Sequence, residues 1–252
     1  MTALVSLENV TLAYGRHVAL EGVNASFPEG SLTAVAGPNG SGKSTMLKAV
    51  AGILKPRRGR VIMGKEAAKS LAYLPQTQAL QRDFPMTVEE AAAGGFYPRL
   101  GDWGMIDQTR RAEISYALKE VGLEGFEKRG IEGLSSGQFQ RLLFARLMLQ
   151  DAKLILLDEP FAAVDAETTA KLINLLLQWH RQGRTVVCVL HDLLLIKKYF
   201  PQAIVLGGKC LGRGHTHELF EQKLLSFDLD MAELCPDEKH ATHHHHGHDH
   251  EH

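Results

Sequence analysis

Eight consecutive residues, Gly37 to Ser44, constrain the fold of this chain most strongly, because they read Gly-Pro-Asn-Gly-Ser-Gly-Lys-Ser. They follow a short apolar run at 32–36 and precede a stretch, 44–51, that predicts a helix. The spacing G-x-x-x-x-G-K-[ST] between strand and helix is typical of loops that bind phosphate, since glycines let backbone N–H groups turn inward around an anion. An ordinary glycine-rich turn is the alternative, but such a turn has no need of Lys and Ser at this offset.

The loop supplies the first set of candidate site residues. A helix N-terminus favours negative charge, so Lys43 is expected to contact the β- and γ-phosphates of a bound nucleotide and Ser44 to ligate Mg²⁺. The candidate phosphate-binding residues are Gly37, Pro38, Asn39, Gly40, Ser41, Gly42, Lys43, Ser44 and Thr45.

Two acidic residues, Asp158 and Glu159, follow the apolar run 154–157. A strand this apolar is expected to be buried, so the acids emerge at its carboxyl end, beside the phosphate loop. Asp158 is then placed to coordinate Mg²⁺, and Glu159 is placed to orient and deprotonate an attacking water. A strand that ends in Asp-Glu is a weak signal by itself. His191 follows the run 186–190 in the same way, and its position alone leaves a structural or a catalytic role open.

Strands and helices alternate along most of the chain, which predicts an α/β fold with a mostly parallel sheet covered on both faces. Residues 77–150 interrupt this alternation and read as a helical insertion, with helix-capping signals at Thr87, Asp107 and Ser135. Asp165 is expected to cap a later helix.

Composition excludes several classes of protein. The 252 residues, 44% of them apolar, are enough for one domain with a buried core. The net charge of -1 gives no reason to expect a nucleic-acid partner, and three cysteines, an odd number, predict thiols rather than a disulfide framework. The apolar runs are far shorter than the ~20 residues that cross a bilayer. The N-terminus lacks the features of a signal peptide, so a role at a membrane is expected to require a separate spanning protein.

The most specific mark is the run Leu134-Ser135-Ser136-Gly137-Gln138, which precedes Asp158 along the chain. Together with the phosphate loop and the acids, it resembles the signature of the nucleotide-binding subunits of ABC transporters, and the resemblance extends over roughly 5–220. Ser136 stands where this family usually has glycine, but serine is small and keeps its backbone N–H, so phosphate contact is expected to survive. The resemblance implies a P-loop NTPase (ABC ATPase) core, an N-terminal antiparallel β subdomain and an inserted helical subdomain.

The resemblance also implies roles for single residues. Tyr14 is similar to the aromatic residue that stacks on adenine, and Gln76 to the glutamine that reaches Mg²⁺ and the attacking water. Asp165 resembles the aspartate that follows the hydrolysis segment, and His191 the switch histidine. The family arrangement is a head-to-tail homodimer in the ATP-bound state, in which each ATP lies between the phosphate loop of one subunit and Ser135, Ser136, Gly137 and Gln138 of the other.

Weaker marks favour an importer of metal ions. The run 83–88 follows Gln76 at the point where importers dock the permease, and the segment 158–165 resembles that of zinc and manganese importers. These features predict an ATPase that energises the uptake of a transition-metal ion, zinc first, at the cytoplasmic face of the membrane, with permease subunits and, indirectly, an extracytoplasmic solute-binding protein as partners. Another solute (manganese, an iron chelate or an amino acid) is the alternative, and a soluble ABC ATPase outside transport is a more remote one.

The chain is expected to divide into an ABC ATPase domain over 1–225, a C-terminal extension over 226–239 and a tail over 240–252. Eight of the thirteen tail residues are histidine, and histidine-rich tracts are typical of metal binding. The candidate zinc ligands are His243, His244, His245, His246, His248 and His250. A purification tag is the alternative, although Gly247, Asp249 and Glu251 interrupt the histidines.

Overall fold

The computed structural model describes residues 3–76, 84–100, 106–162 and 164–226. A six-stranded sheet in the order β5-β6-β7-β3-β8-β9 forms the centre. Its first five strands pair in parallel and the edge strand β9 pairs antiparallel with β8. In sheet order the strands are Leu71–Leu74, Leu154–Asp158, Thr185–Val189, Leu32–Ala36, Gln202–Leu206 and Cys210–His215.

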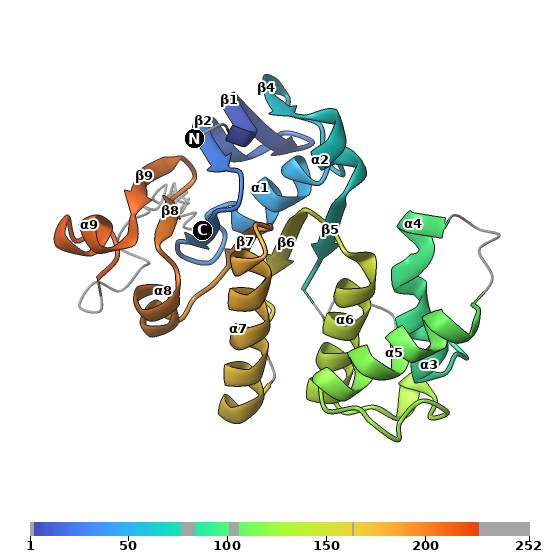
Figure 1. Ribbon diagram of the computed structural model, residues 1–252. Coiled ribbons are helices and arrows are strands. Elements are labelled where there is room, and N and C mark those ends of the chain that lie inside the picture. The colour runs from blue at the N-terminus through green and yellow to red at the C-terminus, as the bar shows by residue number, and fades with distance from the viewer. Residues whose placement is uncertain (1–2, 77–83, 101–105, 163, 227–252) are drawn as a thin grey trace, which may run out of the picture.

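A second, antiparallel sheet of three strands lies over one face of the first, in the order β2-β1-β4 (Figure 1). Its strands are β1 (Ala3–Tyr14), β2 (His17–Pro28) and β4 (Arg58–Met63). β1 and β2 form a hairpin in which Tyr14 pairs with His17. The turn between them uses Gly15 with a φ of 59°, a conformation that glycine adopts without strain.

The helices fall into two groups. α1, α7, α8 and α9 accompany the six-stranded sheet, whereas α3, α4, α5 and α6 lie together to one side of it, between β5 and β6 along the chain (Figure 1). The α-helices α1 to α9 span Lys43–Val50, Lys65–Lys69, Val88–Ala93, Tyr97–Leu100, Gln108–Glu120, Ser136–Gln150, Ala166–Arg181, Leu193–Tyr199 and Thr216–Glu221, and two 3₁₀ turns span Gly94–Phe96 and Ile131–Gly133. Among the described residues, none of these helices has the length and apolar character to cross a membrane.

Side-chain caps begin five of the described helices, including α8, where Asp192 accepts from two backbone N–H groups. The hydroxyls of Thr87 and Ser135 each accept from a backbone N–H three residues on. Their own backbone N–H groups donate in return to the side-chain oxygens of Glu90 and Gln138, which completes a capping box at each helix. Asp107 caps α5 in the predicted way, and Asp165 caps α7. The capping signals in the sequence are therefore confirmed.

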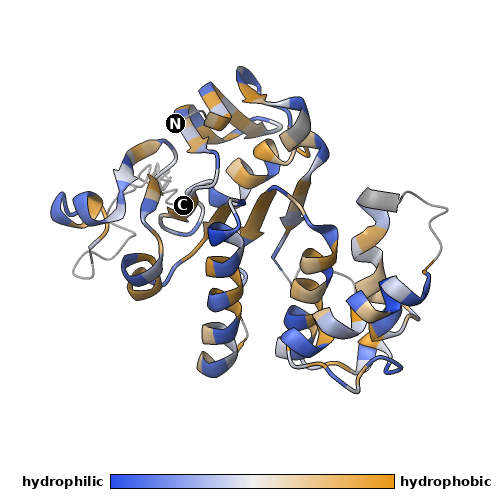
Figure 2. Ribbon diagram, viewed as in Figure 1, coloured by the Kyte–Doolittle hydropathy of each residue, from blue (hydrophilic) through white to orange (hydrophobic). Residues whose placement is uncertain are grey.

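The central strands are buried on both faces, and alternate residues serve two separate cores. In β6, Leu154 and Leu156 face the antiparallel sheet and α1, whereas Ile155 and Leu157 face α6 and α7. Figure 2 shows the central strands as mainly apolar, while α7 carries both polar and apolar residues. That mixture is expected, because the buried residues of α7 are confined to one face.

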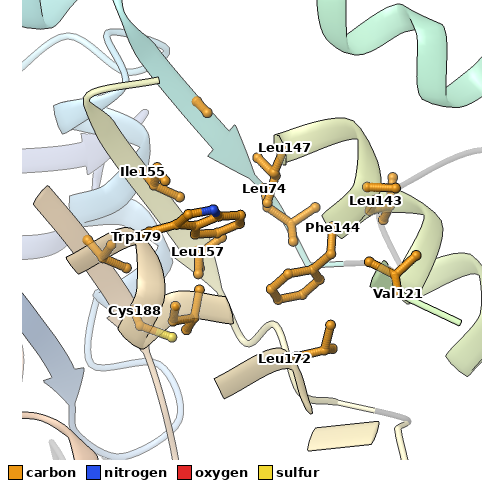
Figure 3. Close-up of a cluster of buried hydrophobic side chains, with 14 of the residues drawn as sticks. Leu74, Val121, Leu143, Phe144, Leu147, Ile155, Leu157, Leu172, Trp179 and Cys188 are labelled. Carbon is orange, nitrogen blue, oxygen red and sulfur yellow. The ribbon is translucent and has the colours of Figure 1, made fainter. Parts of the chain in front are cut away.

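The larger core joins the helical group to the sheet through aromatic side chains. Phe144 of α6 stacks on Trp179 of α7 with ring centroids 6.3 Å apart, and Figure 3 shows the two rings beside the strand residue Leu157. Phe161, which follows β6, stacks on Phe144 at 6.4 Å. These stacked rings place α6 firmly against the segment that follows Glu159.

The predicted α/β class with a mostly parallel sheet is confirmed, and several predicted element bounds differ. The phosphate-loop helix begins at Lys43 and not at Ser44, and β4 begins at Arg58, three residues before the apolar run 61–63 on which a strand is predicted. The sequence pattern missed α2, α4, β9 and α9 altogether. β9 was missed because as an edge strand it is half exposed and carries two glycines, so it lacks the apolar run that marks the central strands.

Candidate active site

The loop after β3 can take its path only because of two glycines. Gly37 has a φ of 150°, and a Cβ there would collide with the carbonyl oxygen of Leu206 and lie 2.6 Å from Ser41 Oγ. Gly42 has a φ of 92°, and a Cβ there would collide with the side chain of Leu20. These two positions turn the chain back toward α1, whose first residue is Lys43.

The start of α1 is suited to an anion. Gly42 has no side chain to cap the helix, and the first turn carries no acidic residue, so its backbone N–H groups are open to an outside acceptor. The buried Ser41 Oγ likewise has no hydrogen-bond partner among the described residues. An unsatisfied hydroxyl beside a free helix terminus fits a phosphate group.

Lys43 supplies a positive charge at the same place. Its residue is 5% exposed, and its Nζ donates to the carbonyl oxygens of Gly37 at 2.9 Å and Pro38 at 2.7 Å. Burial lowers the pKa of the Lys43 amine, while the charges of Glu159 and Asp158 act in the opposite direction. The ammonium group is thus held against the loop by weak acceptors that a phosphate could replace.

Asp158 ends β6 and is 2% exposed. Its Oδ1 accepts a hydrogen bond of 2.9 Å from Ser44 Oγ, and its Oδ2 lies 3.5 Å from the hydroxyl of Tyr73. Burial raises the pKa of the Asp158 carboxyl, and the Ser44 hydrogen bond opposes that shift. A hydroxyl and a carboxylate side by side are hard oxygen donors of the kind that Mg²⁺ prefers.

Tyr73 was missed by the sequence analysis, because its position beside Asp158 depends on the pairing of β5 with β6. Burial, followed by the nearby charge of Asp158, raises the pKa of the Tyr73 phenol. The hydroxyl therefore keeps its proton and can act as a donor.

Glu159 and His191 form the third part of the site. Glu159 Oε1 lies 2.7 Å from His191 Nε2, and because a carboxylate only accepts, the imidazole nitrogen donates in this contact. The two residues follow neighbouring parallel strands, since β6 pairs with β7. Glu159 has a φ of 50°, an uncommon conformation for a residue with a side chain, and it lines a cavity together with residues of the loop.

A cavity of about 310 Å³ lies beside the loop and Glu159. Of the predicted site residues, its lining includes Tyr14, Asn39, Gly40, Gly42, Lys43, Ser44, Thr45, Gln76 and Glu159. His17 and Ala19, which the sequence analysis did not single out, complete the lining. Tyr14 is 47% exposed, and Lys48 Nζ lies over its ring, 6.0 Å from the centroid.

Two predicted sets lie elsewhere on the chain. The start of α6 is formed by Ser135, Ser136, Gly137 and Gln138, and Asp165 caps the start of α7. Neither the signature residues nor Asp165 is among the described residues that line the cavity. Hydrogen bonds from the N–H and hydroxyl of Thr168 lower the pKa of Asp165, in keeping with its capping position. One copy of the chain therefore does not bring the signature residues to the phosphate loop.

The histidines of the predicted zinc tail lie outside the described residues. Within the parts of the chain that the structure does describe, no three His, Cys, Asp or Glu side chains form a group suited to a metal ion.

Comparison with known proteins agrees with this geometry. A sequence model described as ABC transporter matches residues 20–162. A probable metal transport system ATP-binding protein of Chlamydia pneumoniae is 39% identical over 217 residues, 84% of each chain. The manganese transport system ATP-binding protein MntB of Listeria monocytogenes is 34% identical over 88% of this chain and 95% of its own. The zinc transport system ATP-binding protein TroB of Treponema pallidum is 37% identical over 87% of this chain and 84% of its own.

Solved structures share the fold. A nucleotide-free ATP-binding cassette from an ABC transporter superposes with a TM-score of 0.75 at 26% identity, over 92% of this chain and 98% of its own. A dimeric ATP-binding cassette in a post-hydrolysis state, bound to ADP and Pi, has a TM-score of 0.74 at 29% identity, over 84% of this chain and 98% of its own.

Fold and site together define a nucleotide hydrolase with a phosphate loop at the carboxyl edge of a parallel sheet. The family match includes that loop, the signature and both acids, so this chain belongs to the ABC transporter family. It is an ATPase, and it acts on ATP together with Mg²⁺.

The Lys43→Ala variant should lose ATP binding and turn over ATP at least about a hundredfold more slowly, because no other described cation is held against the loop carbonyls. Titration with a fluorescent ATP analogue and a phosphate-release assay measure the two effects. Lys171→Ala is the control, since Lys171 is exposed and pairs only with Glu167 on α7. An affinity for ATP within a few-fold of the unaltered chain would show that Lys43 does not contact the phosphates.

Proposed function

We propose that this chain is the ATP-hydrolysing subunit of an importer for a transition-metal ion, and that the ion is zinc. The convergence of Lys43, Ser44 and Glu159 around one cavity, with Asp158 hydrogen-bonded to Ser44, carries the ATPase part of the proposal. The relatives named for metal, manganese and zinc transport support the metal part. The histidine-rich tail favours zinc over manganese, because imidazole suits Zn²⁺ whereas Mn²⁺ prefers carboxylate and carbonyl oxygen.

The loop and α1 would bind the phosphates. Backbone N–H groups of 39–44 and the ammonium of Lys43 would neutralise negative charge, and Lys43 would exchange its bonds to Gly37 and Pro38 for phosphate oxygens. Ser44 and Asp158 would hold Mg²⁺, with Gln76 approaching from the same cavity. When bound, the ion withdraws charge from the phosphates during transfer.

Glu159 would act as the general base. Its carboxylate lines the cavity and lies 2.7 Å from His191 Nε2, so His191 can hold it in position and stabilise its negative charge. Tyr14 lies at the rim of the same cavity, where its exposed ring would stack on the adenine.

A second copy of the chain would complete the site. Ser135 and Ser136 are exposed at the start of α6, and the N–H groups of this helix turn are suited to the γ-phosphate held by a partner. A relative of known structure is dimeric, which supports a head-to-tail homodimer in the ATP-bound state.

The Glu159→Gln variant tests both the base and the dimer. The amide keeps the size of the carboxylate but cannot accept a proton, so ATP should still bind while turnover falls about 10²- to 10⁴-fold. Because ATP then persists between the two copies, the variant should elute as a dimer in size-exclusion chromatography with Mg-ATP. Glu167→Gln, an exposed change on α7, should behave as the unaltered chain does. A Glu159→Gln chain that stays monomeric and turns over ATP normally would contradict both assignments.

The permease would dock in a groove of about 320 Å³ beside β5 and α6. Its lining includes Pro75, Phe84, Met86 and Arg146. Phe84 is 62% exposed, and a large exposed aromatic beside a groove is typical of a protein contact. Docking there would place the chain at the cytoplasmic face of the membrane, with the solute-binding protein on the opposite side of the permease.

Phe84 and Met86 should respond differently to truncation. Phe84→Ala should abolish or strongly reduce transport in cells while the free energy of unfolding changes by less than about 0.5 kcal/mol, because the side chain is exposed. Met86→Ala should lower the free energy of unfolding by about 1–3 kcal/mol, since Met86 packs against the core. Urea unfolding and ATPase assays on the purified variants accompany the transport assay. Normal transport by folded Phe84→Ala would refute docking at this groove.

The tail would bind zinc without contributing to catalysis. A chain truncated after Lys239 should hydrolyse ATP at the normal rate and lose zinc binding in calorimetry, and zinc binding by the full chain should weaken below about pH 6 as the imidazoles protonate. The truncated chain keeps His215 and His217, whose ring centroids lie 5.7 Å apart. Any zinc binding that remains after truncation would therefore point to this pair. Unchanged zinc stoichiometry after truncation would refute a zinc-binding tail.

A further inference from the structure

Tyr73 lies in the middle of β5 on the face of the sheet that carries Asp158. β5 pairs in parallel with β6, and Tyr73 stands opposite Leu156, two residues before Asp158. From there the Tyr73 side chain extends along the carboxyl direction of the strands, and its hydroxyl lies 3.5 Å from Asp158 Oδ2. The ring is half-buried and packs against the core between the two sheets.

The two oxygens of Asp158 have different partners. Oδ1 accepts from Ser44 Oγ at 2.9 Å, and Oδ2 is next to the Tyr73 hydroxyl. Ser44 lies in the first turn of α1, and its Oγ would turn a lone pair toward a cation, so that Asp158 Oδ1 faces the ion as well as the hydroxyl. The hydroxyl of Tyr73 remains on the other oxygen, so it can hold the carboxylate plane when the ion binds.

We propose that Tyr73 is a positioning residue for the cation site, which orients Asp158 so that Oδ1 faces Ser44 and the bound ion. This role rests on the proposed function of Asp158 and Ser44 as the residues that hold Mg²⁺. It differs from the role of Gln76, three residues further along, because Tyr73 acts through Asp158 and does not line the nucleotide cavity.

The Tyr73→Phe variant removes the hydroxyl and keeps the ring. Loss of one hydrogen bond to a charged group should raise the Mg²⁺ concentration for half-maximal ATPase activity about three- to tenfold. The affinity for Mn²⁺ in the presence of ATP, measured by electron paramagnetic resonance, should weaken by the same factor. The affinity for a fluorescent ATP analogue in EDTA and the melting temperature should stay as in the unaltered chain, because neither depends on the orientation of the carboxylate.

Tyr116→Phe is the matched control, since it removes the same hydroxyl from an exposed position on α5. It should change none of the four quantities. Asp158→Asn is the reference variant and should weaken Mn²⁺ binding more than Tyr73→Phe does.

The outcomes separate the two proposals. If Asp158→Asn weakens Mn²⁺ binding and Tyr73→Phe leaves it unchanged, the positioning role is wrong and the cation site stands. If Tyr73→Phe lowers the melting temperature and the EDTA affinity along with the Mn²⁺ affinity, the hydroxyl has a structural role only, and the positioning role is again wrong. If Asp158→Asn binds Mn²⁺ as the unaltered chain does, the cation site itself is misassigned and both proposals fall.

Discussion

Parallel pairing of three fully buried strands, β3, β6 and β7, is the constraint on which the rest of this structure depends. Parallel strands end at the same edge of a sheet, and side chains that are too polar for the core can appear only where the strands stop. The residues at those three ends lead directly into Gly37, into Asp158 and Glu159, and into His191. Backbone hydrogen bonding between apolar strands thus brings the functional residues to one edge of the sheet.

Electrostatics then sets how the site behaves. Burial acts on Lys43 and Asp158 in opposite directions, lowering one pKa and raising the other, so each charged form depends on partners within the site. Lys43 finds loop carbonyls, which a phosphate can replace, and Asp158 finds the hydroxyls of Ser44 and Tyr73. The positive φ of Glu159 adds local strain at the same edge. Such a site gives up some stability of the unliganded chain in favour of binding.

The helical group extends the influence of this edge to distant surfaces. α6 runs from the capping box at Ser135 to the turn before β6, and its Gln140 Nε2 donates to the carbonyl oxygen of Pro160 at 2.7 Å. The stacked rings of Phe144, Phe161 and Trp179 add an apolar contact along the same helix. The exposed start of α6 and the segment after Glu159 are therefore parts of one packed unit, a suitable arrangement for a subunit whose site needs a second copy.

Local patterns in the sequence determined the phosphate loop, the capping boxes at Thr87 and Ser135, the buried strands and the fold class, because each depends on residues close together in the chain. Only the tertiary structure decided which strands are neighbours. The pairing of β5 with β6 brings Tyr73 to Asp158, and packing around the groove exposes Phe84 while it buries part of Met86. Spacing along the chain carries no information on such contacts. They are selected by the free energies of loop closure and of packing between segments that are distant in the sequence.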